Sequence, residues 1–162
     1  MGDWRVIGVS LKMEKESHEE LGVKKPFMGG AIMDVNVDDI KRVSDNIILK
    51  IPQRAMKGHL HAHVEARNIK NIIDKQVIDE NGKDVGIIAD VMLDSESWMF
   101  PSVLIRLNKD VLELLRMEKC PDCERHVLLP MGNVGSIGDN VMLNIDKETM
   151  GDLVQKAPVK TM

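Results

Sequence analysis

The sequence predicts an all-β chain, rich in strands with only short helices, that consists of two tandem copies of one small barrel-like unit. Three observations predict this: short apolar segments separated by turn residues, a hairpin signal at Asn81-Gly82, and a repeat at a fixed offset of 94 residues. A chain of 162 residues has room for one domain or two small ones. The repeat carries the most weight of the three, because internal repeats determine the architecture of a chain.

The repeat is clearest between IKRVSDNIILKI (40–51) and VGSIGDNVMLNI (134–145), which share an Asp-Asn pair and a final Leu and Ile. When the offset is kept and no gap is introduced, Trp4 aligns with Trp98, and these are the only two tryptophans. Identity is low, but the alignment without gaps and the paired tryptophans indicate two copies of one unit, spanning residues 3–51 and 97–145.

Each copy is predicted to contain a strand, a short helix and two further strands. The first strands are expected at Val6–Leu11 and Val103–Leu107, and the helices at 13–22 and 108–117. In each copy a turn centred on Asp-Asn joins the last two strands, since both residues satisfy their own backbone and tolerate left-handed geometry.

A hairpin precedes only the second copy. In VIDENGKDVGIIADVMLD (77–94), Asn81-Gly82 is typical of a type I′ turn, which needs a positive φ at two positions. Gly86 lies inside the following strand and indicates a bulge or a tight bend. The predicted division is 1–57 as a copy without its first hairpin, 58–70 as a linker, 71–146 as a complete copy and 147–162 as a tail.

The complete copy resembles the PRC-barrel domain, a small β-barrel shared by the photosynthetic reaction-centre H subunit and the ribosome maturation factor RimM. The stretches that carry the resemblance are IIDKQVIDENGKDVGIIADVMLD (72–94), SVLIRL (102–107) and HVLLPMGNVGSIGDNVML (126–143). The Leu-Gly-x-Lys-Lys element of short archaeal members occurs here as LGVKK (21–25), in the first copy.

The resemblance implies a non-catalytic adaptor in protein–protein interactions. Archaeal proteins of this kind act as interaction scaffolds, and some join cell-division assemblies through SepF, which anchors the FtsZ ring. The resemblance to RimM implies a different role, in ribosome or RNA maturation. RimM-type factors carry an N-terminal domain of another fold, whereas the N-terminal part of this chain looks like a second PRC copy.

Cys120, Cys123 and His126 form the pattern CPDCERH and are candidate zinc ligands. A fourth ligand could come from the alternating histidines of GHLHAHVE (58–65). A single CxxC is only half of the usual structural zinc site, so two unligated thiols and a redox switch remain open alternatives. A zinc- or redox-dependent regulator is accordingly a third functional hypothesis.

The remaining candidates are structural or interface residues. Asp45 and Asp139 occupy the Asp-Asn turns, and Gly82 and Gly86 shape the hairpin. The two tryptophans are expected to anchor a core or a domain interface. We recognise no nucleophile with a base and no carboxylate pair at a known spacing, so we expect no enzyme and no obligatory cofactor.

The overall composition limits the classes of partner that the chain can bind. The net charge is −4 and the pI about 5.7, which disfavours nucleic acid as a partner. There is no apolar run of 18 residues, and MGDWRVIG lacks the core of a signal peptide, so we expect a cytoplasmic protein without a membrane span. A copy without its hairpin exposes strand edges. We therefore expect either pairing of residues 58–73 with that copy or a homodimer in which residues 3–51 contribute to the interface.

Overall fold

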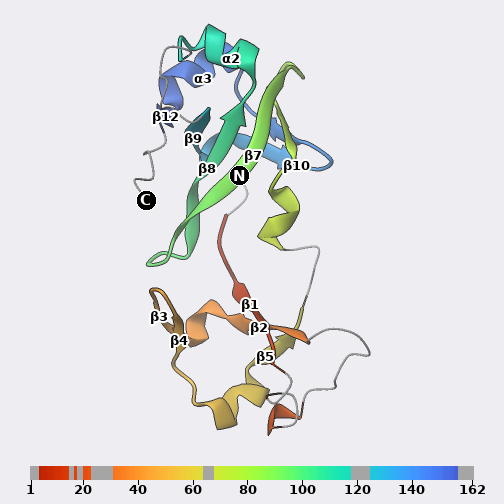
Figure 1. Cartoon of the computed structure of the whole chain (residues 1–162), viewed down its shortest axis with the longest axis vertical. Coiled ribbons are helices and arrows are strands. Elements are labelled where there is room, and N and C mark those ends of the chain that lie inside the picture. The colour runs from red at the N-terminus through yellow and green to blue at the C-terminus, as the bar shows by residue number, and fades with distance from the viewer. Residues whose placement is uncertain are drawn as a thin grey trace. The chain divides into compact units, whose positions relative to one another are not determined.

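A computed structural model of the chain describes most of its residues and divides them into two compact units. The N-terminal unit comprises Arg5–Ala66, and the C-terminal unit comprises Met1–Trp4 together with Arg67–Met162. The described residues are 4–14, 17, 20–22, 31–63, 68–117 and 125–156. Figure 1 shows the two units, which we describe one at a time.

The C-terminal unit is built on one seven-stranded sheet with the order β10-β11-β6-β7-β8-β9-β12. All neighbours are antiparallel except β11 and β6, which are parallel. The strands are β6 (Gln76–Ile78), β7 (Asp84–Asp94), β8 (Met99–Leu107), β9 (His126–Pro130), β10 (Val134–Ile137), β11 (Val141–Leu143) and β12 (Gln155–Lys156). The helices are α2 (Lys109–Leu114), α3 (Lys147–Leu153) and the 3-10 turns η4 (Ile69–Ile72) and η5 (Met131–Asn133).

The sheet curls around a single aliphatic core. Residues at alternate positions of β8 and β9 point inward, as the two-residue period of a strand requires, and Val103, Ile105, Val127 and Leu129 are at most 1% exposed. Val134 of β10, near the other end of the sheet order, belongs to the same core. Strands that are distant in the sheet order can share one core only if the sheet bends round on itself.

The N-terminal unit contains two separate small sheets. One has the order β1-β2-β5, all antiparallel, and the other is the hairpin β3-β4. The strands are β1 (Gly8–Lys12), β2 (Ile32–Asn36), β3 (Ile40–Val43), β4 (Ile47–Leu49) and β5 (Leu60–Ala62), with 3-10 turns η1 (Val37–Asp39) and η2 (Gln53–Gly58).

The two units repeat the same elements at the offset of 94 residues. In chain order, β1, β2, η1, β3 and β4 correspond to β8, β9, η5, β10 and β11. The strand register also repeats: Gly8 pairs with Asn36 as Ser102 pairs with Pro130. The irregularity of the β3–β4 pairing, between Ile40 and Arg42, recurs between Val134 and Ser136.

The correspondence extends past residue 51. Asp34 pairs with His61 in the way that Leu128 pairs with Gln155, so β5 occupies on β2 the place that β12 occupies on β9. Residues 60–62 are thus a strand inside what the sequence suggested as a linker. They pair with the edge of β2 that faces away from β1, and they do not take the place of a missing hairpin.

The type I′ prediction for the opening hairpin is wrong. Gly82 has a φ of +75°, but Asn81 is not among the residues with positive φ. The loop is longer than two residues, because β6 ends at Ile78 and β7 begins at Asp84. The side chain of Asp79 holds it, accepting hydrogen bonds from the backbone N–H groups of Asn81 (2.9 Å) and Lys83 (2.8 Å).

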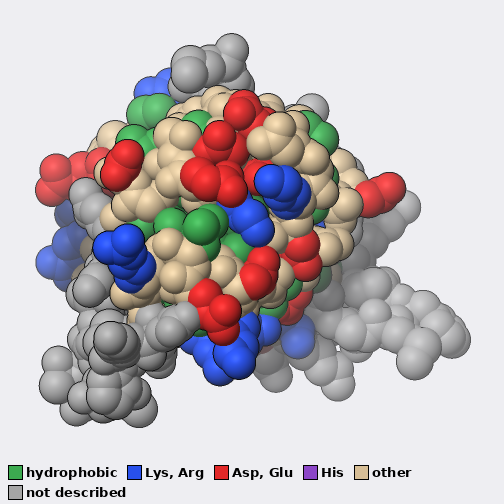
Figure 2. All heavy atoms as spheres, turned by 90° about the horizontal axis from the view of Figure 1, so that it is seen from above, with side chains coloured by type: hydrophobic (Ala, Val, Ile, Leu, Met, Phe, Trp, Pro, Cys, Tyr) green, Lys and Arg blue, Asp and Glu red, His purple; other side chains and the backbone are tan. Residues whose placement is uncertain are grey.

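The predicted fold class, β-rich with few short helices, is confirmed. None of the helices among the described residues is long and apolar enough to cross a membrane. On the face drawn in Figure 2, acidic and basic side chains are interspersed with apolar ones. That face therefore carries mixed charge, without a continuous basic stripe of the kind that binds nucleic acid.

Candidate interaction site

The hairpin β6–β7 closes the C-terminal unit by bridging two strands. β7 pairs antiparallel with β8, with Gly86 opposite Leu107 and Ile88 opposite Ile105. β6 pairs in parallel with β11, with Val77 opposite Val141. The hairpin thereby pairs one edge of β8 and one edge of β11 at once, and it covers the aliphatic interior between them.

Gly86 lets β7 approach β8 closely. A Cβ atom at this position would lie 2.1 Å from the backbone oxygen of Arg106 and 3.1 Å from the Cα of Leu107. No side chain fits at such distances, and the obstacle is backbone, which cannot rotate away. The expectation that Gly86 shapes the hairpin therefore has a steric explanation in this contact.

The N-terminal unit has the strands but, among the residues that the structure describes, not the hairpin. β1 lies at one end of the order β1-β2-β5, and β4 pairs with β3 alone. These are the strands that correspond to β8 and β11. Within the described part of the chain, the two edges that β6–β7 pairs in the C-terminal unit are without a strand partner here.

The interior side chains differ in burial accordingly. Val9 and Leu11 of β1 are only half-buried, whereas their counterparts Val103 and Ile105 are at most 1% exposed. In β4, Ile47 is 43% exposed, whereas its counterpart Val141 is 1% exposed.

Leu49 and Leu143 show the same contrast with identical side chains, half-buried in one unit and 1% exposed in the other. At all four positions the N-terminal unit keeps an aliphatic residue of the kind that lines a closed barrel. Within the described part of the chain, no counterpart of the hairpin β6–β7 covers these residues.

Comparison with protein families identifies the C-terminal unit. Residues 65–150, more than half of the chain, match the model of the PRC-barrel domain. The chain belongs to this family. A PRC barrel is a small β-barrel module that is often used in protein interactions. The matched residues include the closing hairpin and end within α3, and no curated protein matches the chain.

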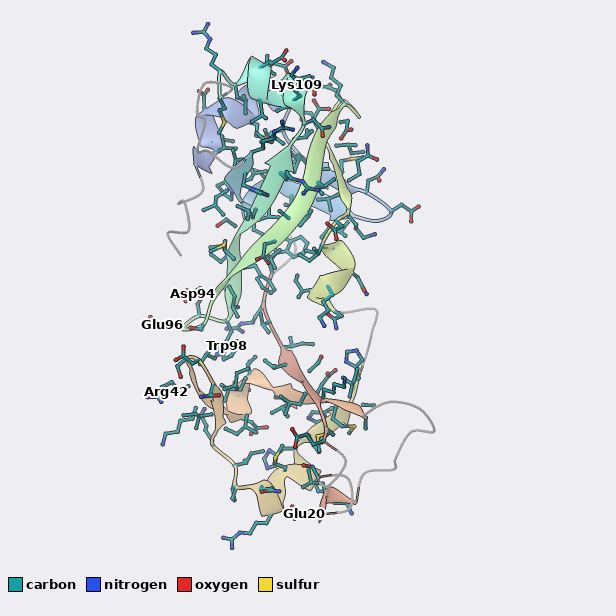
Figure 3. All side chains as sticks on the ribbon, viewed as in Figure 1. Glu20, Arg42, Asp94, Glu96, Trp98 and Lys109 are labelled. Atoms are coloured by element: carbon teal, nitrogen blue, oxygen red, sulfur yellow. The ribbon has the colours of Figure 1, made fainter. Side chains whose placement is uncertain are left out.

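The tryptophans proposed as anchors both lie in the C-terminal unit. Trp4 packs against the core, and its backbone oxygen accepts a hydrogen bond from the N–H of Phe100 (3.0 Å). Trp98 is half-buried, has a φ of +55° and lies at the tip of the β7–β8 hairpin (Figure 3). At the same tip, Asp94 accepts hydrogen bonds from the Ser97 hydroxyl (2.6 Å) and the Glu96 N–H (3.0 Å), which lower the pKa of its carboxyl.

The other candidates are placed as follows. Asp45 and Asp139 are exposed, in the turns that join β3 to β4 and β10 to β11. Cys120 and Cys123 lie outside the described residues. His126 begins β9, opposite Arg106. Within the described part of the chain, no three His, Cys, Asp or Glu side chains gather in a way that could hold a metal ion.

The sequence reading missed Asp79, which is fully buried. Besides the two N–H groups of the hairpin loop, its carboxylate accepts from the backbone N–H of Lys147 (3.3 Å), at the start of α3. Asp79 thus ties the loop to α3. A signal was present in the sequence, since Asp two residues before Asn-Gly is typical of a side chain that hydrogen-bonds the backbone of its own turn.

Proposed function

We propose that this chain is a non-catalytic protein–protein adaptor with two PRC-type units in tandem, the first of them incomplete. The observation that carries the proposal is the set of aliphatic residues Val9, Leu11, Ile47 and Leu49. They occupy interior positions of a barrel yet remain partly exposed. β-Strand addition in recognition uses an exposed strand edge for main-chain hydrogen bonds and the side-chain pockets beside it for specificity.

The tandem organisation is supported by the shared offset of 94 residues and by strand register that agrees pair by pair. Two unrelated folds would not reproduce both the pairing and its irregularity. We expect the adaptor to work in the cytoplasm, since the sequence contains no apolar run of 18 residues. The family resemblance noted in the sequence suggests that it is of the archaeal type. On the same ground, we expect its partners among proteins of cell division.

Capture of partners on the purified full chain from an extract of the native cells tests the pathway. Proteins of cell division would support the proposal. Ribosomal proteins would favour the alternative, a RimM-like factor in ribosome or RNA maturation. For that alternative, binding to generic RNA would have to be tight at about 150 mM salt with a steep salt dependence, since such binding rests on clustered Lys and Arg.

The oligomeric state is a separate question. A homodimer in which residues 3–51 contribute to the interface stays a prediction. Light scattering on the pure chain at tens of micromolar gives the mass directly. A mass of two chains would support a second copy as the source of the missing surface.

A zinc- or redox-dependent regulator is the remaining alternative, and it depends on Cys120, Cys123 and His126. If these residues ligate zinc, the purified chain carries close to one zinc per chain or per dimer, and Cys120→Ser loses it. A native chain that is free of metal and equally stable would end this alternative.

A further inference from the structure

The C-terminal unit shows what pairs with the strand edges that correspond to the open edges of β1 and β4. There, β6 runs parallel to β11 and β7 antiparallel to β8. The counterparts β4 and β1 offer the same two edges in the same relation to their own partners, β3 and β2. We call the space between the free edges of β1 and β4 the hairpin gap.

The free edges of the hairpin gap need hydrogen-bond partners. Backbone N–H and C=O groups at a strand edge form strong hydrogen bonds and template the addition of another strand. The neighbouring aliphatic residues Leu11 and Ile47 are partly exposed, so an added strand would also bury apolar surface. Both contributions favour an occupant with two strands over a single extended peptide, since β1 and β4 each have an edge to fill.

The chain does not supply this occupant from its described residues. β5 lies on β2, in the place of β12, and leaves the hairpin gap untouched. The hairpin β6–β7 is engaged in its own unit, where Val77 and Val85 are fully buried.

The hairpin β6–β7 of a second copy cannot fill the hairpin gap without leaving its own unit. Each chain has two places for a hairpin and, among its described residues, one hairpin of this kind. A reciprocal exchange of this hairpin would therefore open one unit for every unit that it closes.

We propose that the hairpin gap binds a β-hairpin from a different protein. This inference rests on the proposed adaptor function and names the kind of partner. By analogy with the C-terminal unit, the first strand of the partner hairpin runs parallel to β4 beside Ile47 and Ile48. The second runs antiparallel to β1 beside Leu11 and Lys12.

The hairpin β6–β7 also indicates which residue types the partner hairpin needs. Its inward positions are aliphatic, as Val77, Val85 and Ile88 are. Its second strand carries a glycine at the position of Gly86, which lies opposite Leu107 and faces the backbone oxygen of Arg106. In the N-terminal unit the corresponding backbone oxygen is that of Lys12. A hairpin without that glycine cannot approach β1 as closely as β7 approaches β8.

The experiment gives the full chain a second copy of its own hairpin. Residues 71–96 are added ahead of residue 3 in place of residues 1 and 2, which reproduces the natural connection at the offset of 94. A matched control carries Gly86→Val in the added segment only. The measurement is backbone hydrogen exchange at β1 and β4, on the amides that face away from β2 and β3.

We expect these amides to exchange at least about tenfold more slowly in the completed chain than in the native chain, and to remain fast in the control, because exchange reports the local opening of hydrogen bonds. Unchanged exchange in the completed chain, or equal protection in the control, would overturn the inference. So would slow exchange of these amides in the native chain, since that would mean that the chain or a second copy already fills the hairpin gap.

Partner capture separates this inference from the adaptor proposal. A partner that uses the hairpin gap is captured by the native chain and by the Gly86→Val control, and is lost from the completed chain. Equal capture by all three leaves the adaptor function in place and overturns the hairpin gap as its site. Capture by none of the three removes the adaptor proposal itself.

Discussion

The two units use matching strands in matching register and end in different states. In the C-terminal unit four interior residues of β8 and β11, namely Val103, Ile105, Val141 and Leu143, are at most 1% exposed. Their counterparts in β1 and β4 are half-buried or exposed. The sequences at these positions are similarly aliphatic. Among the described residues, the hairpin β6–β7 pairs with β8 and β11 and has no counterpart in the N-terminal unit. We therefore attribute the difference to this hairpin and not to the residues that it covers.

The C-terminal barrel is closed by its first two strands, β6 and β7, acting together. β6 and β7 pair two strand edges and bury two aliphatic rows in one step. Without them the remaining strands fall into two separate sheets, as β1-β2-β5 and β3-β4 do. A unit in that condition keeps its local pairing, and within the described part of the chain β1 and β4 each have one edge without a strand partner.

We expect the largest effect on the free energy of unfolding when Leu143 is replaced by alanine, and we compare it with the same substitution at its counterpart Leu49. Leu143→Ala removes a side chain that is 1% exposed, and we expect a loss of about 3 kcal/mol in the free energy of unfolding. Leu49→Ala removes a half-buried one, and we expect about 1 kcal/mol or less, as for substitutions outside a packed core. Urea unfolding followed by tryptophan fluorescence reports the C-terminal unit, where both tryptophans lie. Hydrogen exchange reports the N-terminal unit.

Equal losses for the two leucines would contradict the comparison. They would mean that the interior of the N-terminal unit is covered in solution as well as that of the C-terminal unit.

Gly86→Ala tests whether the close approach of β7 and β8 is needed for closure. The added Cβ would meet backbone 2.1 Å away, so we expect a loss of about 2 to 3 kcal/mol, as for overpacking a fixed site. Gly82 lies in the loop of the same hairpin, and a Cβ added there would have no atom within 4 Å. The only cost of Gly82→Ala is therefore the φ of +75°, which side chains disfavour. We expect about 1 kcal/mol for this control. Thermal unfolding of both variants measures the two losses of stability. A smaller loss for Gly86→Ala than for Gly82→Ala would contradict the steric argument.

Asp79→Ala tests whether the loop between β6 and β7 holds the hairpin in place. It removes a buried acceptor of three backbone N–H groups, and hydrogen bonds to a charged group contribute about 2 kcal/mol. With the loop released, we expect the amides of β6 and β11 to exchange faster, so that the C-terminal unit approaches the condition of the N-terminal one. Asp79→Asn keeps one acceptor oxygen and should lose less. Unchanged exchange at β11 in Asp79→Ala would show that the loop does not hold the hairpin in place.

The sequence was sufficient for the β-rich fold class and for the PRC-barrel unit, because apolar alternation and turn residues are local signals. It was insufficient for β5, a three-residue strand in the stretch that suggested a zinc ligand or a linker. The pairing of β5 depends on β2, about 25 residues earlier. The turn at Asn81-Gly82 was wrong in type because Asp79 supplies acceptors that a two-residue turn would not use. Which edges stay open depends on long-range pairing, which no local pattern encodes.

The smallest expected effect concerns the helix that follows β11. In α3 the side chain of Asp146 accepts a hydrogen bond from the Thr149 N–H (2.7 Å). Its hydrogen bonds to the side chain and the backbone of Thr149 lower the pKa of this carboxyl below its ordinary value of 3.8. Its counterpart in the N-terminal unit is Pro52, which makes no side-chain cap for η2.

Because the folded-state pKa of Asp146 is depressed, its contribution to stability is present above the ordinary pKa and is lost as the pH falls through the lower, folded value. We therefore expect the Thr149 amide resonance to titrate with an apparent pKa below 3.8 and its hydrogen exchange, corrected for pH, to accelerate over the same range. In Asp146→Asn, which keeps an acceptor but cannot ionise, this titration should be absent, and the amides of η2 should show no corresponding step. A Thr149 titration at or above 3.8, or one that persists in Asp146→Asn, would mean that another group controls the start of α3. The capping difference between the two units would then have no consequence for their response to acid.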